Sequence, residues 1–198
     1  MKRTVSMTLA LVLILALCTT ASASTTDGEI TKITGGEILT NHEYGFSFTV
    51  PEGWVAIDYG QRVLLFEQGN DDPVDSNEIN IDMEANYPFT IDDLLNSGDA
   101  FPEELGREME ILADDFRILS SIHSRTIGEW EVAMIVAACN LKKDDFPIYI
   151  QRAILISNDT IYRFTQTTPY DTIVSEGGLN EGSTGYKLNE LISTFTTN

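Results

Sequence analysis

The sequence predicts an α+β domain in which helices cover an antiparallel β-sheet of about six to seven strands. Segments with apolar residues at every second position, typical of half-buried strands, recur along the chain. These segments follow one another across short turns, which favours antiparallel pairing. Two or three helical segments lie between the two runs of strands and at the end of the chain, an order typical of α+β domains.

The size and the charge of the chain exclude several classes of function before any motif is considered. The chain has 198 residues, of which 42% are hydrophobic and 9% aromatic, enough for one packed domain. It carries 31 acidic and 12 basic residues, for a formal net charge of −19. Such a charge argues against nucleic-acid binding, which needs cations to displace phosphate counterions. It argues equally against docking on an anionic membrane surface.

The first 23 residues have the pattern of a secretory signal peptide. Lys2 and Arg3 precede an apolar run from Met7 to Leu17, and Ala21-Ser22-Ala23 forms a small-x-small cleavage site. The run is too short to span a bilayer as a helix. We therefore expect cleavage after Ala23 and a secreted or extracytoplasmic protein of the cell envelope.

The alternative to simple secretion is a lipoprotein that a lipid anchors to the membrane. Cys18 would be the acylated first residue, and the Thr/Ser-rich stretch after it would be a tether, although Leu17 stands where lipoprotein processing prefers a small residue. This anchor is the single route by which we expect membrane association. If Cys18 leaves with the leader, Cys139 is alone and no internal disulfide forms. We expect a monomer.

The next residues, 24–41, are rich in Thr and Gly and are interpreted as a linker, with a short strand near Glu37 to Thr40. Residues 42–198 are then a single domain whose folded part begins near Tyr44. Alternating apolar residues predict strands over residues 44–50, 54–57, 62–66 and 79–83. In the last of these, Ile79, Ile81 and Met83 face the core, and the intervening Asp82 and Glu84 face water.

Helices are predicted next. Thr90 and Asp93 have the spacing of a capping box, and Pro102 suits the first turn of a second helix with Leu105, Met109 and Leu112 on its apolar face. Strands follow over residues 117–124, 129–141, 148–157 and 160–167. A glycine-rich loop at 177–185 then leads to a final helix, marked by apolar residues at helical spacing: Leu188, Leu191, Ile192 and Phe195. We expect Trp54 and Trp130 to be largely buried.

The segment from Tyr44 to Trp54, YGFSFTVPEGW, combines alternating aromatic residues, a Pro-Glu-Gly turn and a tryptophan. It resembles the opening of the PsbP-like families, which are named for an extrinsic subunit of the photosynthetic oxygen-evolving complex and include Ran-binding import factors of the Mog type. The order of elements up to Phe195 is also similar. The resemblance implies an α/β/α sandwich that acts as a non-catalytic binding or assembly module. It transfers no functional residue, because the motif concerns folding.

The sequence contains few residues of the types that act as catalytic nucleophiles and bases. The two histidines, His42 and His123, and the one mature cysteine, Cys139, do not form a recognisable nucleophile–base pair in the sequence. Cys139 lies in an apolar strand, where a thiol usually packs as a small hydrophobe. We therefore predict no catalytic residue, no cofactor and no enzymatic activity, with a weak hydrolase as the least favoured alternative.

Acidic residues concentrate in one part of the chain. Residues 67–115 hold sixteen carboxylates against a single base, Arg107. Three interpretations stay open: a solvated face that maintains solubility, a surface for a basic protein partner, or a divalent-cation site. The cation site would use the loop residues Asp71, Asp72, Asp75 and Glu78, whose oxygens suit Ca²⁺ but lack EF-hand spacing.

Aromatic residues near predicted turns offer one further candidate, an exposed binding patch formed by Tyr87, Phe89, Phe101 and Phe146. Taken together, the sequence predicts an exported, non-enzymatic binding or assembly module of the cell envelope. Its molecular role and its partner are not specified by any motif.

Overall fold

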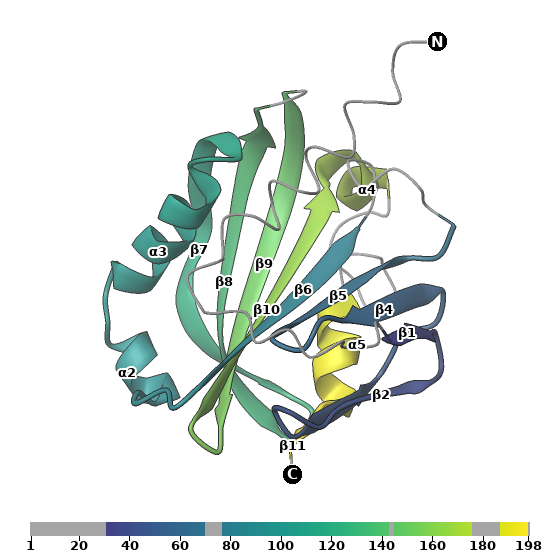
Figure 1. Ribbon diagram of the computed structural model, residues 1–198. Coiled ribbons are helices and arrows are strands. Elements are labelled where there is room, and N and C mark those ends of the chain that lie inside the picture. The colour runs from purple at the N-terminus through teal and green to yellow at the C-terminus, as the bar shows by residue number, and fades with distance from the viewer. Residues whose placement is uncertain (1–30, 70–76, 143–144, 176–186, 198) are drawn as a thin grey trace.

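The computed structural model describes residues 31–69, 77–142, 145–175 and 187–197. Its main element is an eight-stranded antiparallel sheet with the order β1-β4-β5-β6-β10-β9-β8-β7 (Figure 1). The bounds of these strands are β1 (Thr31–Thr34), β4 (Trp54–Asp58), β5 (Arg62–Glu67), β6 (Glu78–Ala85), β7 (Ala113–Ile127), β8 (Trp130–Leu141), β9 (Phe146–Ser157) and β10 (Thr160–Pro169). The predicted α+β class and antiparallel sheet are confirmed.

The main sheet alone exceeds the predicted six to seven strands, and a second, three-stranded sheet accompanies it. It has the order β11-β3-β2, with β2 (Ile38–Asn41), β3 (Phe46–Thr49) and β11 (Thr196–Thr197). The described helices are α2 (Ile91–Leu95), α3 (Ala100–Met109), α4 (Tyr170–Ser175) and α5 (Lys187–Thr194). Helix α4 was not predicted. No helix within the described ranges is both long and apolar enough to cross a membrane.

The strands predicted over residues 117–167 correspond to β7, β8, β9 and β10, which pair in chain order as an antiparallel meander. Asn158 and Asp159 connect β9 to β10 with positive φ angles of 50° and 57°, as a tight two-residue hairpin turn requires. Strand β10 then pairs along its other edge with β6, placing Phe164 opposite Ile81. This pairing joins the N-terminal strands and the meander into one sheet.

The linker prediction is wrong for the part of residues 24–41 that the structure describes. Strand β1 pairs with β4, and β2, which includes most of the short strand predicted near Glu37 to Thr40, pairs with β3. Asn41 is 3% exposed, and its amide nitrogen donates to both carboxylate oxygens of Asp58 and to the carbonyl oxygen of Gly60. Folded structure is therefore present from Thr31 onward, well before Tyr44.

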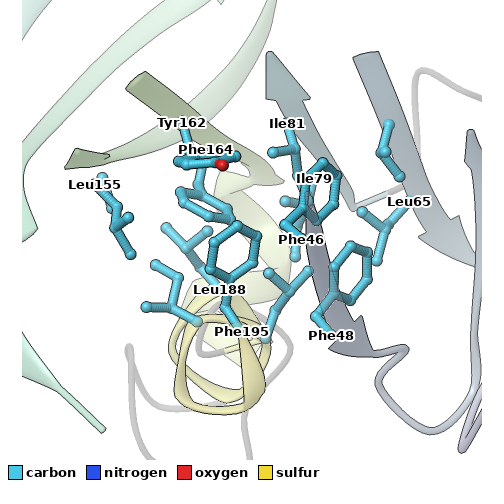
Figure 2. Close-up of a cluster of buried hydrophobic side chains, with 14 of the residues drawn as sticks. Phe46, Phe48, Leu65, Ile79, Ile81, Leu155, Tyr162, Phe164, Leu188 and Phe195 are labelled. Atoms are coloured by element: carbon cyan, nitrogen blue, oxygen red, sulfur yellow. The ribbon is translucent and has the colours of Figure 1, made fainter. Parts of the chain in front are cut away.

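One face of the main sheet packs against α5 and the small sheet. Figure 2 shows Leu188 and Phe195 reaching from the C-terminal segment toward Phe46, Tyr162 and Phe164. The ring of Phe195 lies 5.3, 5.0 and 5.1 Å from the ring centroids of those three residues. Phe195 was predicted within the last helix, but it follows α5, whose last residue is Thr194.

The two tryptophans differ. Trp54 is 2% exposed, as predicted. Trp130 is buried less completely: it is half-buried and packs against the same core cluster. It begins β8 beside the edge strand β7, and its indole NH donates to the carbonyl oxygen of Phe195 over 2.7 Å. A polar ring nitrogen favours such a border position, where it has an acceptor.

The opposite face of the sheet is covered at its β7–β8 end by α2 and α3 (Figure 1). The predicted capping box is confirmed, because Thr90 accepts from the backbone NH of Asp93 and the carboxylate of Asp93 accepts from Thr90. Helix α3 buries Phe101 and Leu105, and it ends at Met109, so Leu112 lies beyond it. These helices form the acidic flank of the molecule.

Candidate functional site

The residues considered for catalysis lie in ordinary structural settings. Cys139 is buried in β8, and burial raises the pKa of its thiol to about 11, which keeps it protonated and unreactive. His123 is exposed on β7, with its Nδ1 atom 3.0 Å from the carbonyl oxygen of Ser121. His42 is exposed in the turn after β2. The structure brings these three residues into no common site.

Three of the four candidate calcium ligands, Asp71, Asp72 and Asp75, lie outside the described residues, as do the predicted leader, Cys18 and the glycine-rich loop. The fourth, Glu78, begins β6, and its carboxylate accepts from the side-chain amide of Asn80 over 2.9 Å. Desolvation raises the pKa of Glu78, opposed by that hydrogen bond and by the charge of Arg62. Among the described residues, no group of three or more His, Cys, Asp or Glu side chains is arranged to hold a metal ion.

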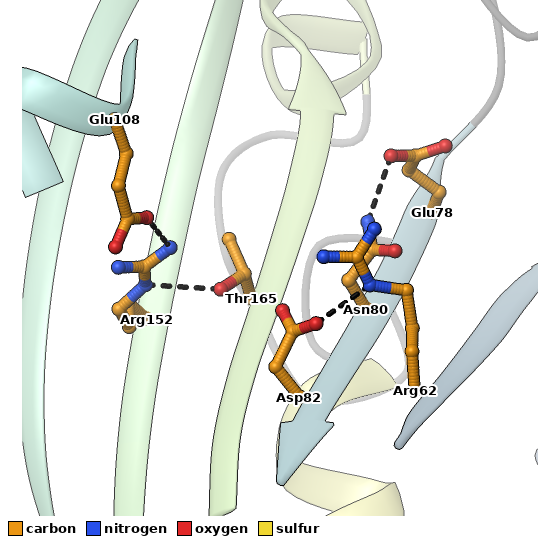
Figure 3. Close-up of polar contacts among 7 residues, drawn as sticks. All are labelled: Arg62, Glu78, Asn80, Asp82, Glu108, Arg152 and Thr165. Carbon is orange, nitrogen blue, oxygen red and sulfur yellow. Dashed lines mark hydrogen bonds and ion pairs between the residues drawn. The ribbon is translucent and has the colours of Figure 1, made fainter. Parts of the chain in front are cut away.

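Glu78 belongs to a set of polar side chains on the sheet face that α2 and α3 partly cover (Figure 3). In this set Glu78 contacts Asn80, Arg62 contacts Asp82, and Arg152 contacts both Thr165 and Glu108. We call these seven residues the sheet-face network. Strand register places Arg62 and Asp82 opposite each other, and their side chains form an ion pair at 2.6 Å. Asp82 was predicted to face water freely; it is half-buried because Arg62 covers it.

Arg152 carries the most buried charge of the sheet-face network. Its side chain is 7% exposed, its Nε donates to Thr165 over 3.0 Å, and its Nη2 donates to Glu108 of α3 over 2.6 Å. The remaining Nη1 atom has no hydrogen-bond partner. Sequence reasoning missed this contact, since Arg152 lies within an apolar run that gives no indication of a paired charge. The network ties α3 to the sheet.

A different arrangement occurs on the outer side of α3, where carboxylates are plentiful and cations few. A hollow of about 600 Å³ lies between α3 and the start of β7. Its carboxylates come from Glu103, Glu110, Asp114 and Asp115, and its cations from Arg107 and Lys142. Lys142 donates to the carbonyl oxygen of Glu110 and lies 3.8 Å from Asp114. All four carboxylate residues are exposed.

A second hollow, of about 480 Å³, lies on the other side of α3 and is called the α2–α3 hollow here. Its aromatic lining gathers three of the four predicted patch residues, Tyr87, Phe89 and Phe101. Phe101 is buried at 3%, whereas Phe89 is 53% exposed. Phe146 is half-buried on β9 and does not line this hollow. The polar lining includes Asp93, Glu104 and Arg107.

Tyr87 connects the α2–α3 hollow to the sheet. Its ring meets Phe89 edge to face, with 5.4 Å between centroids. The guanidinium carbon of Arg163 lies 5.8 Å from the centroid of Tyr87, and Arg163 also pairs with Glu84 at 2.9 Å. Desolvation raises the pKa of Tyr87; Arg163 opposes this shift, and nearby carboxylates, including Glu104, add to it. The surroundings of the ring are therefore predominantly acidic.

Comparison with known proteins identifies the fold. No family model and no curated protein sequence matches this chain. Among solved structures, the cyanobacterial PsbP (CyanoP) of Synechocystis sp. PCC 6803 matches with a TM-score of 0.58 and 13% identity over 89% of this chain and 98% of that one. The Ran-binding protein Mog1p of Saccharomyces cerevisiae matches with a TM-score of 0.54 and 11% identity over 85% and 96%.

Two further structures have the same fold. LpqN of Mycobacterium tuberculosis, described as involved in cell envelope biogenesis, matches with a TM-score of 0.54 and 12% identity over 87% of this chain and 94% of that one. A Bacteroides thetaiotaomicron protein matches with a TM-score of 0.52 and 15% identity over 84% of this chain, which spans about half (49%) of that protein. The expected PsbP/Mog-like fold is thereby confirmed, while identities this low establish the fold alone.

Proposed function

We propose that this protein is an exported, non-enzymatic binding module of the cell envelope that engages a basic protein partner through the acidic surface around α3. That surface, called the α3 acidic surface below, consists of Glu103, Glu104, Glu110, Asp114 and Asp115. Support for a binding role comes from the fold, since Mog1p is a Ran-binding protein. Support for the compartment comes from the leader pattern in the sequence and from LpqN, with its link to the cell envelope.

The observation that carries the proposal is the contrast between two groups of acids. On the sheet face, Asp82 and Glu84 each pair with an arginine, so their charge is balanced locally. Around α3, six carboxylates, the five of the α3 acidic surface and Asp93, border two hollows whose lining includes only Arg107 and Lys142 as cations. Unbalanced charge beside a hollow attracts a partner of opposite sign and accelerates its encounter.

The experiment is a crosslinking capture from envelope extract of the source cell, with the protein purified in the form that the cell exports. The test variant replaces Glu103, Glu110 and Asp114 with their amides. The control variant makes the same change at three exposed acids away from α3: Glu52, Glu129 and Asp171. Captures are compared at about 0.1 M and about 1 M salt, where the Debye lengths are about 10 and 3 Å.

A basic protein captured at the lower salt by the wild type and the control variant, and lost at the higher salt and with the test variant, is the expected result. Equal capture by all three proteins, or capture that salt does not weaken, would reject the α3 acidic surface as the binding site. The intact mass of the same preparation decides the N-terminus. A chain beginning after Ala23 fits simple secretion, and a chain beginning at an acylated Cys18 fits the lipoprotein alternative.

A further inference from the structure

The α2–α3 hollow combines an exposed aromatic ring with a carboxylate that has no partner. Phe89 is 53% exposed at the rim, beside Tyr87. Within the described part of the chain, the carboxylate of Glu104 forms neither an ion pair nor a hydrogen bond. Asp93 lines the same hollow, but its carboxylate already accepts two hydrogen bonds from Thr90. Glu104 is therefore the group available to a ligand.

The lining of the α2–α3 hollow contains one more carboxylate than cations. Two carboxylates, Asp93 and Glu104, line it together with one guanidinium, that of Arg107. The Nε atom of Arg107 is directed to its own helix, 3.4 Å from the carbonyl oxygen of Glu103. A half-buried, uncompensated carboxylate gains most from a cation that also excludes water.

The chain itself provides an example of the recognition chemistry a few ångströms away. Arg163 places its guanidinium over the ring of Tyr87 and pairs with Glu84 at the same time. A planar cation is held there between the negative face of an aromatic ring and a carboxylate. Phe89 and Glu104 line the α2–α3 hollow together with Tyr87 and supply the same two elements, a ring and a carboxylate.

We infer that the α2–α3 hollow receives an arginine side chain of the basic partner, with the guanidinium against Phe89 and paired with Glu104. This inference rests on the proposed function and adds to it the chemistry of one contact. Arginine is favoured over lysine because its guanidinium is flat, stacks on rings and presents two donors to one carboxylate.

The test uses the full chain and a defined probe, a short glycine-serine peptide with one arginine, followed by NMR titration. A second peptide carries citrulline, which has nearly the same shape without the charge, and a third carries lysine. We expect the arginine peptide to shift the amide resonances of Tyr87, Phe89 and Glu104. Ring currents should also move the δ-methylene protons of the bound arginine upfield. The citrulline and lysine peptides should bind more weakly.

Variants test whether peptide binding depends on the α2–α3 hollow or only on the negative charge of the surface. Phe89→Leu keeps an apolar side chain but removes the ring face, and should weaken binding about three- to fivefold. Glu104→Gln should weaken it at least as much. Asp92→Asn is the matched control, because Asp92 is exposed on α2 and lines neither hollow. Its binding should equal that of the wild type.

Shifts centred elsewhere, equal affinity for the citrulline or the lysine peptide, or an equal effect of Asp92→Asn would overturn the inference. Its failure is distinguishable from failure of the proposed function. A partner captured through the α3 acidic surface with no contribution from Phe89 would leave the function standing without the arginine contact. A peptide bound in the hollow, with no basic protein captured, would do the reverse.

Discussion

The indole NH of Trp130 donates to the backbone carbonyl oxygen of Phe195 over 2.7 Å, and the two rings meet edge to face at 6.2 Å. This pair joins the beginning of β8 to the residue that follows α5, 65 positions later in the chain. Because Phe195 also contacts Phe46, Tyr162 and Phe164, the hydrogen bond holds the central ring of the aromatic core in place.

Replacing Trp130 with Phe should destabilise the protein by about 1 to 2 kcal/mol, because the carbonyl oxygen of Phe195 loses its donor at a partly buried position. Urea denaturation followed by the fluorescence of Trp54 measures the change. Tyr170→Phe, at an exposed position, is the control and should change stability by less than about 0.5 kcal/mol. Equal stability of the two variants would show that the hydrogen bond contributes nothing.

Truncating Phe195 to Ala should cost about 3 to 5 kcal/mol, as expected for a large ring removed from a packed core. Phe89→Ala should cost less than about 1 kcal/mol, since that ring is 53% exposed. The same denaturation experiment compares them. A large loss of stability in Phe89→Ala would mean that this ring supports the fold and is not free to contact a partner.

Glu108→Ala should destabilise the protein by about 2 to 3 kcal/mol, because Arg152 would keep a buried charge without its carboxylate. The exposed neighbour on the same helix, Glu103→Ala, serves as the control. Replacing both members of the pair, Arg152→Met with Glu108→Leu, should recover most of the lost stability. If the double variant is as unstable as Glu108→Ala, the ion pair itself stabilises the fold.

The pH dependence of stability should change in Glu78→Gln. Desolvation raises the pKa of Glu78 in the folded protein above the ordinary 4.5, so its ionisation destabilises the wild type as the pH rises through the folded-state pKa. Glutamine does not ionise, and its oxygen can still accept from Asn80. The variant should therefore gain stability over the wild type at about pH 7, and less at about pH 4. A stability difference between the two proteins that stays constant from about pH 4 to about pH 7 would contradict this prediction.

The melting temperature of the protein should be the same in the presence of a metal chelator and in millimolar calcium. Glu78, the one candidate ligand that the structure describes, is held by Asn80 on the sheet face. An ion that binds only the native state, at a concentration 100 times its dissociation constant, raises the free energy of unfolding by about 2.7 kcal/mol. A rise of several degrees in calcium would contradict this prediction and support the cation site.

Much of the sheet was predictable because burial imposes a period of two on each strand. Ile79, Ile81 and Met83 are buried as their alternation predicted. Strand β1 was missed, since four residues with a single apolar member, Ile33, give no clear period. The pairing of β6 with β10 was equally out of reach, because it joins segments that helices separate in the chain.

The candidate site was less predictable than the fold. The excess of acids marked the right stretch of sequence, yet it did not distinguish Asp82, which pairs with Arg62, from Glu104, which has no such pair among the described residues. That difference depends on which strands lie side by side. The grouping of Tyr87 with Phe89 and Phe101 was suggested by their positions at turns, whereas the hollow that they line depends on how α2 and α3 are both placed on the sheet.

The most direct test of the central claim is a map of zero-length crosslinks between carboxylates of this protein and lysines of its captured partner. Carbodiimide coupling followed by peptide mass spectrometry reports which acids touch the partner. We expect the crosslinks to concentrate on the α3 acidic surface, that is, on Glu103, Glu104, Glu110, Asp114 and Asp115. Crosslinks confined to acids elsewhere on the surface, such as Glu52 and Asp171, would contradict it.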